Sequence, residues 1–414
     1  MSSTGTVLPT GSLRIAVFTH DTFGLGHVRR CLHIVRSLAA RRPDSSILFL
    51  TGSPALHLFR SLPPNVDMIK IPTVVKTGAK AFRPPHLQIP IVELAGLRRG
   101  IMLEAVRGFG PDVFLVDNFP LGSQGELYAI LQELHRTRCR TVLGLRDVLD
   151  TPEAVRADWE RQGMHEILDR YYDRILVYGM REVFDVGESY GLAPQVSRRV
   201  RYCGYVTDDG PVGDVDASGV VPTPFVMATG GGGGDAFPLL QTFVRALPSL
   251  PELPVLIVTG PLMSETLRTK LAKTVNGRSS VIVRDYLPDL RGYLARAAAV
   301  VSMCGYNTAA EIVATRARAV VAPRTWQYGE HSRRHTAGAE GEQLLRARAL
   351  ARLGLVDCIE PGDLNPERLA EHVRTLLGAG APPHTELDLG GRERVVDHLL
   401  ETNQSLSGGS HGCD

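Results

Sequence analysis

Short apolar runs alternate with amphipathic helical patterns along nearly the whole chain, and this rhythm limits the possible folds more than any other feature. In the first half, strands are predicted at residues 14–19, 47–50, 68–71, 113–116, 141–145, 175–178 and 200–205. Between the first two, apolar side chains recur at the spacing of one helix face: Val28, Cys31, Leu32, Val35 and Leu38. Near-continuous apolar strands separated by helices are typical of parallel sheets covered on both faces.

The rhythm breaks at residues 207–222, a polar stretch rich in Gly and Pro that is typical of a linker. It resumes with strands predicted at residues 225–229, 255–259, 281–284, 300–302 and 320–322. We therefore predict an α/β protein with two doubly wound, Rossmann-like domains, residues 13–206 and 223–385, and a cleft between them. A chain of 414 residues suits two domains of about 200 residues each.

The two ends of the chain are predicted separately. Residues 386–403 carry a helical pattern whose apolar face could pack on either domain. Residues 1–12 and 404–414 are rich in Ser and Gly, which predicts flexible ends.

Composition argues against several classes of protein. The net charge is only +2, so the overall charge balance does not call for nucleic acid or another polyanionic partner. The N-terminus lacks the basic and apolar regions of a signal peptide, and no stretch approaches the ~20 apolar residues of a membrane span. The six cysteines are scattered without a CxxC pair, which predicts reduced thiols, no zinc site and a cytoplasmic protein.

Loops that follow strands are the candidate sites, because ligands of open parallel sheets bind beyond the carboxyl ends of the strands. The first such loop holds Gly24, Gly26 and His27, followed by Arg29 and Arg30. The glycines allow a sharp turn into a helix, and an anionic ligand would explain two arginines that otherwise oppose the helix dipole. A tight turn beside a solvated basic patch is the alternative. Arg29 replaces the third glycine of the dinucleotide fingerprint, which argues against an NAD-dependent oxidoreductase.

A run of five glycines follows the first strand of the second half and begins with Gly230, Gly231 and Gly232. Such a run has a large entropic cost and is expected where a backbone must be approached closely, so its amides could hold a diphosphate. No Lys-Ser/Thr pair follows, so the run is not the phosphate loop of an ATPase. A plain flexible loop is the alternative.

Two further loops after strands carry polar groups. In the first, Gly305 precedes Asn307 and Thr308, either of which could cap the next helix. Glu311 lies one turn beyond Asn307 on the same face, although a cap followed by an ordinary helical glutamate gives the same pattern. The second loop, residues 323–334, mixes aromatic, amide, acidic and imidazole groups, as sugar-binding loops do. A surface loop with chance polar residues is the alternative.

Three segments resemble family 28 glycosyltransferases, the family of the transferase that makes lipid II in peptidoglycan synthesis. They are GLGHVRR at residues 24–30, TGGGGG at residues 229–234 and CGYNTAAEIVATRARAVVAPR at residues 304–324. The C-terminal resemblance covers residues 224–355, whereas the N-terminal one depends mainly on one loop. The resemblance implies a GT-B fold whose C-terminal domain binds a nucleotide-diphosphate sugar, commonly a UDP-sugar. The acceptor side departs from the lipid II enzyme, so we expect a different hydroxyl acceptor, lipid-linked or a glycan.

The resemblance also implies how the donor binds. By motif position, Glu311 would bind the ribose hydroxyls. Gly305, Tyr306 and Asn307 would lie at the phosphates, with the glycine run nearby.

The nucleotide base and the sugar would lie on either side of the phosphates. The base would lie against the backbone of Arg284, Tyr286 and Leu287. Glu330 and His331 fall where the family has an acid or amide pair on the donor sugar, although relatives typically have glutamine in place of His331.

The resemblance further implies inversion by direct displacement, with a general base on the N-terminal side. His27 is a candidate because the pKa of imidazole lies near the operating pH. Asp117 and Asp147 are rivals, since each follows a predicted strand and would face the same cleft. Amides and helix N-termini would offset the leaving-group charge, so we expect no metal and no cofactor. One Asp-x-Asp signature, at Asp214 and Asp216, falls in the predicted linker and is interpreted as coincidence.

Two other functions stay open at this stage. The loop at residues 24–30 also resembles that of the nucleotide-sugar hydrolase of pseudaminic acid synthesis, and a nucleotide-sugar-binding protein without catalysis is the second alternative. Peripheral contact with the inner face of the membrane is a further hypothesis. Residues 73–97 mix basic and apolar side chains, although ordinary packing of a loop and a helix gives the same pattern.

Overall fold

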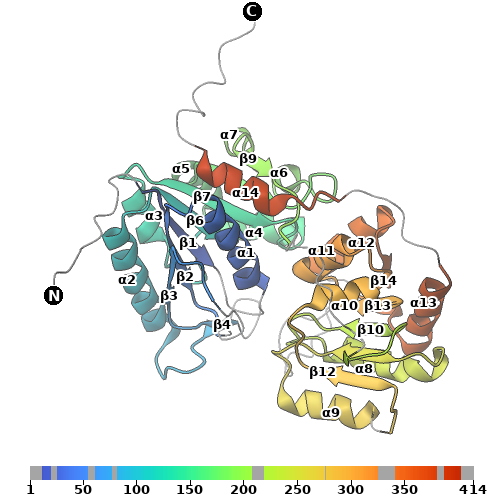
Figure 1. Ribbon diagram of the computed structural model, residues 1–414. Coiled ribbons are helices and arrows are strands. Elements are labelled where there is room, and N and C mark those ends of the chain that lie inside the picture. Colours follow the sequence, from blue (N-terminus) through green and yellow to red (C-terminus); the bar gives the residue numbers. More distant parts are fainter. Residues whose placement is uncertain are drawn as a thin grey trace, which may run out of the picture.

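The structure is a computed structural model that describes residues 12–19, 26–54, 61–76, 82–207, 219–275, 277–324, 341–379 and 387–401. These residues form two α/β domains, each built on one parallel sheet with helices packed against it (Figure 1). The predicted class, α/β with two Rossmann-like domains, is confirmed. The predicted linker joins the two domains, and its residues 208–218 lie outside the described residues.

The N-terminal sheet has the strand order β3-β2-β1-β6-β7-β8-β9. Its strands are β1 (Arg14–Thr19), β2 (Ser46–Thr51), β3 (Val66–Lys70), β6 (Val113–Asp117), β7 (Arg140–Arg146), β8 (Arg174–Tyr178) and β9 (Val200–Tyr202). The predicted strand at residues 200–205 is too long, because Gly204 turns the chain with a φ of 81°. A short antiparallel ribbon, β4 (Val75–Lys76) with β5 (Phe82–Arg83), was not predicted.

Helices cover both faces of this sheet, as alternate residues of β1 show. Ile15 and Val17 join the apolar cluster under one face, and Ala16 and Phe18 join the cluster under the other. The first cluster includes residues of α1, and the second includes residues of α2 and α3. The helices of this domain are α1 (Gly26–Arg41), α2 (Ile91–Phe109), α3 (Tyr128–Leu134), α4 (Pro152–Arg161), α5 (Met164–Tyr171), α6 (Val186–Ser189) and α7 (Pro194–Ser197).

The C-terminal sheet has the strand order β12-β11-β10-β13-β14-β15. Its strands are β10 (Val226–Thr229), β11 (Val255–Val258), β12 (Val281–Arg284), β13 (Ala299–Ser302), β14 (Ala319–Val321) and β15 (Asp357–Cys358). The two-residue strand β15 was not predicted, since its apolar signal is too short. The helices are α8 (Phe237–Ala246), η3 (Leu247–Ser249), α9 (Glu265–Val275), α10 (Leu290–Arg296), α11 (Tyr306–Ala314), α12 (Glu342–Arg352), η4 (Pro361–Asp363) and α13 (Pro366–Gly378).

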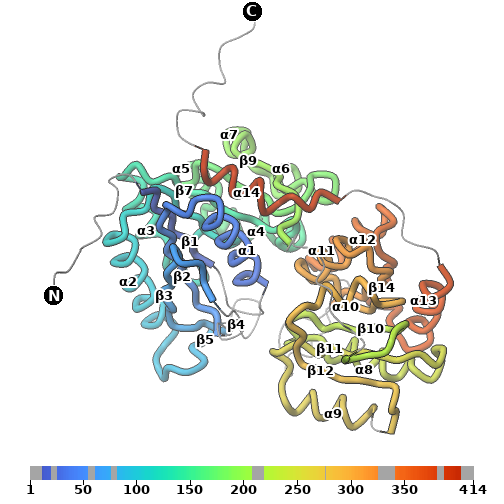
Figure 2. The backbone as a smooth tube through the Cα atoms, viewed as in Figure 1, coloured from blue at the N-terminus to red at the C-terminus, as the bar shows by residue number. Residues whose placement is uncertain are grey.

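The last helix, α14 (Gly391–Leu400), returns to the N-terminal domain and lies along α1 (Figure 2). Arg41 forms an ion pair of 2.6 Å with Asp397, and the Ser37 hydroxyl donates to Glu393 at 2.9 Å. Val395, Val396 and Leu399 are fully buried. The structure thus decides which domain the C-terminal helix packs on. No helix in the described ranges is long and apolar enough to cross a membrane.

The strand order indicates where each of the two sheets is expected to bind a ligand. In each sheet the order reverses beside the first strand: between β1 and β6 in the N-terminal sheet, and between β10 and β13 in the C-terminal sheet. Ligands of doubly wound folds bind at this switch point. The loops after β1, β6, β10 and β13 are therefore the candidate ligand-binding loops.

Candidate active site

A cavity of about 980 Å³ has walls from both domains and opens onto these switch-point loops. The predicted site residues that line it are Gly26, His27, Gly230, Gly231, Gly232, Tyr286, Leu287, Gly305, Tyr306 and Asn307. Four others, Asp117, Asp147, Arg284 and Glu311, lie behind this lining or away from it. Gly24, Glu330 and His331 lie outside the described residues, as do Asp214 and Asp216 of the linker.

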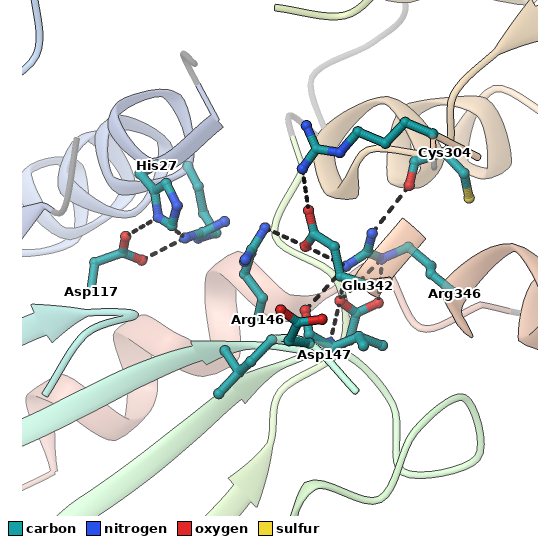
Figure 3. A network of polar contacts seen from close by, with 12 residues as sticks. His27, Asp117, Arg146, Asp147, Cys304, Glu342 and Arg346 are labelled. Carbon is teal, nitrogen blue, oxygen red and sulfur yellow. Dashed lines mark hydrogen bonds and ion pairs between the residues drawn. The ribbon is translucent and has the colours of Figure 1, made fainter. Parts of the chain in front are cut away.

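His27 lies in the first turn of α1 and forms a close pair with Asp117 at the end of β6 (Figure 3). Its Nδ1 is 2.6 Å from Oδ2 of Asp117, and Nη2 of Arg30 donates to Oδ1 of the same carboxylate at 2.6 Å. The side chains of Asp117 and Arg30 are 0% and 1% exposed. The aromatic rings of Tyr178 and Tyr306 each lie 5.1 Å from the Arg30 guanidinium, which fixes its position further.

The charges around this pair determine the protonation of His27. Burial alone would raise the pKa of Asp117, but the charge of Arg30 and the hydrogen bonds from His27 and Arg30 outweigh burial and hold that pKa well below its usual range. Burial lowers the pKa of His27, against the opposing effect of Asp117. The imidazole is therefore neutral near pH 7, donates from Nδ1 to an ionised carboxylate and carries its lone pair on Nε2. This is the tautomer that a general base needs.

The glycine run after β10 is packed directly against the loop after β11. A Cβ atom on Gly230 would lie 2.7 Å from the carbonyl oxygen of Thr259, and one on Gly233 would lie 2.4 Å from it. No larger residue fits at these two positions. The amides of Gly232 and Gly234 donate to no atom of the described residues, and both glycines line the cavity. Two backbone donors are thus available to an anion.

Helix α11 begins beside the glycine run with an uncapped N-terminus. Its N-cap is Gly305, and no side chain caps the first turn. The prediction that Asn307 or Thr308 caps this helix is wrong, because the helix already starts at Tyr306. Asn307 instead donates from Nδ2 to the carbonyl oxygen of Gly26 across the domain boundary, at 3.1 Å. The uncapped amides and the helix dipole favour an anion at this end.

Glu311 is held by a residue of the other domain. Its Oε1 forms an ion pair of 2.8 Å with Nη2 of Arg29, which lies on α1. The Glu311 side chain is 6% exposed, whereas that of Arg29 is 32% exposed and lines the cavity. The carboxylate predicted to bind ribose is thus occupied by a cation at the edge of the cavity.

The predicted nucleotide-base segment is only partly at the cavity. Tyr286 and Leu287 line it, and Tyr286 is 39% exposed. Arg284 ends β12, where its carbonyl oxygen accepts from the backbone amide of Thr259 at 2.9 Å. The backbone of Arg284 therefore supports the loop after β11.

Asp147 is buried at the contact between the domains. Nε and Nη2 of Arg346, on α12, donate to its two carboxylate oxygens at 2.9 and 2.8 Å. The Tyr205 hydroxyl and the Val148 amide donate to the same oxygens at 2.9 and 2.7 Å. The side chains of Asp147 and Arg346 are both 0% exposed, so the structure places Asp147 in an interdomain ion pair instead of at the cavity surface.

A second group of charged and polar residues lines the cavity without having been predicted: Arg146, Asp235, Arg324, Glu342 and Gln343. Arg146 of the N-terminal domain pairs with Glu342 at 2.6 Å (Figure 3). Arg324 pairs with Glu342 and with Asp235. The sequence signal was present, since Glu342-Gln343 is an acid–amide pair that follows β14. It was missed because Glu330-His331 comes first after the same strand.

Comparison with known proteins identifies the C-terminal domain. Residues 225–385 match the glycosyltransferase family 28 C-terminal domain. Two curated relatives carry the name UDP-N-acetylglucosamine--N-acetylmuramyl-(pentapeptide) pyrophosphoryl-undecaprenol N-acetylglucosamine transferase. The one from Levilactobacillus brevis is 21% identical over 85% of this chain and 87% of its own length. The one from Exiguobacterium is 28% identical over 37% of this chain and 43% of its own length.

The fold has a matching counterpart among solved structures. The glycotransferase of kitacinnamycin superposes with a TM-score of 0.59 at 16% identity, covering 94% of this chain and 95% of that one. A likeness at this identity shows the fold. Residues 225–385 therefore carry a family 28-like C-terminal domain, and the chain as a whole is similar to family 28 glycosyltransferases and has the GT-B fold.

Proposed function

We propose that this glycosyltransferase moves a hexose-type sugar from a UDP-sugar to a hydroxyl acceptor, with inversion and without a metal or cofactor. One observation carries the proposal: His27, paired with Asp117, and the uncapped start of α11 line the same cavity from the N-terminal and the C-terminal domain, respectively. A base and an anion site that face each other are what displacement at a sugar carbon needs.

The donor would lie on the C-terminal wall. The amides of Gly232 and Gly234 and the N-terminus of α11 would hold the diphosphate, and Tyr286 would cover the nucleotide base. Glu342 and Gln343, instead of Glu330 and His331, are the acid–amide pair that we assign to the sugar hydroxyls, because they line the cavity.

In the transfer step, Nε2 of His27 takes the proton of the acceptor hydroxyl. The acceptor oxygen attacks the anomeric carbon from the face opposite the diphosphate and forms the new C–O bond. The bond from that carbon to the diphosphate oxygen breaks, and its electron pair leaves with UDP. Asp117 stabilises the imidazolium that forms, and the amides of the C-terminal wall stabilise the leaving group.

Donor binding would open the Arg29–Glu311 ion pair. The ribose hydroxyls need the Glu311 carboxylate, which Arg29 occupies at 2.8 Å. Once released, the Arg29 guanidinium stays at the cavity, where a bound diphosphate would give it a new anionic partner. We therefore assign Arg29 two partners: Glu311 without donor and the diphosphate with donor.

Replacing Arg29 by Ala is expected to change uridine and UDP binding in opposite directions. Uridine has only the ribose, so it should bind about 2- to 5-fold more tightly once Glu311 is unoccupied, as expected for a partly exposed ion pair. UDP loses a charge-assisted contact and should bind about 10-fold more weakly. Calorimetric titration measures both affinities.

Arg41→Ala is the matched control, since Arg41 lies on the same helix in an exposed pair with Asp397. Both affinities should stay unchanged in it. If UDP fails to bind the wild type, the proposed function is wrong; if UDP binds but Arg29→Ala leaves the UDP-to-uridine ratio unchanged, only the role of Arg29 is wrong.

A further inference from the structure

The loop after β6, residues 118–127, forms the N-terminal wall of the cavity beside His27, and a buried ion pair keeps it in place. Arg98 of α2 donates to Glu126 from Nη2 and Nε at 2.8 and 3.2 Å, and both side chains are nearly inaccessible. The Ser123 hydroxyl and the backbone amide of Gln124 donate to the same carboxylate at 2.9 and 2.6 Å. The wall is therefore preorganised before any ligand arrives.

Asn118 is the first residue of this loop and has an unsatisfied amide. It adopts a left-handed conformation, with a φ of 66°, and is only 4% exposed. Its Oδ1 accepts no hydrogen bond from any described residue, although the side chain lines the cavity. A buried polar group without a partner costs about 1–3 kcal/mol, so a partner supplied from the cavity would recover that cost.

The rest of this wall carries a large apolar surface beside the polar side chains of Ser123, Asp150, Asp158, Arg161 and Gln162. Phe119 is 39% exposed, although it lies directly beside the buried Asp117–Asn118 segment. Helix α4 and the loops around it supply further hydrocarbon surface on the same side. The apolar side chains of the N-terminal wall include Phe119, Leu121, Leu149, Val155, Trp159 and Met164.

The arginines that line the cavity are already matched by carboxylates. Within the described ranges the pairs are Arg29–Glu311, Arg30–Asp117, Arg146–Glu342, Arg161–Asp158 and Arg324–Asp235. In the function proposed above, donor binding releases Arg29 from Glu311, and Arg29 then pairs with the diphosphate of the donor. An additional negative charge on the N-terminal wall would therefore face no unmatched cation, and its desolvation would go uncompensated.

We propose that the loop at residues 118–127 is the acceptor subsite, and that the acceptor has a neutral, apolar body next to its reactive hydroxyl. Asn118 positions that hydroxyl, or a neighbouring polar group, by an amide hydrogen bond, while Phe119 and Trp159 cover the apolar body. This inference rests on the proposed function, since it concerns the acceptor of the same reaction. A neutral, apolar acceptor would distinguish this chain from a transferase whose acceptor presents a diphosphate at this wall.

The test uses two probes that share one ring system: 2-naphthol, which is neutral at pH 7, and 2-naphthyl phosphate, which is anionic. Both are titrated calorimetrically into UDP-saturated full-length protein. We expect 2-naphthol to bind at least 10-fold more tightly than the phosphate. Asn118→Gly keeps the left-handed backbone and removes the side-chain amide. The affinity for 2-naphthol should fall by about 3- to 10-fold in this variant, the effect of one neutral hydrogen bond.

Ser61→Gly is the matched control, because Ser61 also has a positive φ, of 58°, and does not line the cavity. It should leave 2-naphthol affinity unchanged. The inference is overturned if the phosphate binds more tightly, if neither probe binds, or if Asn118→Gly binds 2-naphthol like the wild type. UDP affinity, measured in the same variants, separates the two failures: loss of UDP binding in the wild type counts against the proposed function, whereas normal UDP binding with any of these outcomes counts against the acceptor subsite alone.

Discussion

Replacing His27 by Ala is expected to lower kcat by about 10²- to 10⁴-fold, the usual contribution of a general base. The KM for the UDP-sugar should change little, because His27 is not among the residues proposed to hold the donor. The wild-type rate should also fall as the pH drops through the pKa of His27, which burial holds below its ordinary value. Protonation fills the Nε2 lone pair, so activity is lost on the acid side. Steady-state UDP release, followed across pH, measures both effects.

His33→Ala is the control for this prediction, since His33 lies on the same helix and does not line the cavity. Its kcat should match that of the wild type. A His27→Ala variant that keeps more than a tenth of the wild-type kcat, with the acid limb of the pH profile unmoved, would show that another group takes the proton.

Breaking the Asp147–Arg346 pair is expected to produce the largest loss of stability. Replacing Arg346 by Met leaves the Asp147 carboxylate buried without its counter-charge, which costs about 3–5 kcal/mol in the free energy of unfolding. For domains of this size the cost corresponds to a fall in Tm of about 6–20 °C. The pair joins β7 to α12, so the loss should also weaken the contact between the domains. Thermal unfolding followed by circular dichroism measures the change.

Two companion variants make the stability result specific. Asp147→Leu combined with Arg346→Met removes both charges and should recover much of the lost stability, because no buried charge remains unpaired. Asp397→Asn removes one partner of an exposed pair and should cost less than about 1 kcal/mol. If Arg346→Met unfolds at the same temperature as Asp397→Asn, the buried pair does not hold the domains together.

Much of the fold could be predicted from the sequence because its signals are local. Apolar runs such as those of β1 and β6 mark parallel strands, and the carboxyl ends of parallel strands meet at one edge. Because ligands bind at the edge where these carboxyl ends meet, the sequence alone predicted His27, the glycine run and Gly305 as site residues. All of them line the cavity. It also brought out Asp117, which contacts His27 from the neighbouring strand end.

What the sequence could not supply are contacts between domains. Asp147 looks like Asp117 in the sequence, since each comes at the end of an apolar strand. Only the position of α12 shows that Arg346 reaches Asp147, and only the position of α1 shows that Arg29 reaches Glu311. Such pairs depend on how two separately folded domains meet, which no local pattern records. The same holds for α14, whose apolar face fits α1 only in three dimensions.

The central claim is that the C-terminal wall binds a uridine diphosphate sugar through Glu311. The most direct measurement is thermal unfolding of wild type and Glu311→Gln against UDP, GDP, ADP and UDP-hexoses. A ligand at 100 times its Kd adds about 2.7 kcal/mol of stability, an easily visible rise in Tm. The account predicts that UDP and its sugars stabilise the wild type and that Glu311→Gln loses most of this response. If no nucleotide stabilises the wild type, or if Glu311→Gln responds equally, the account of the donor site is contradicted.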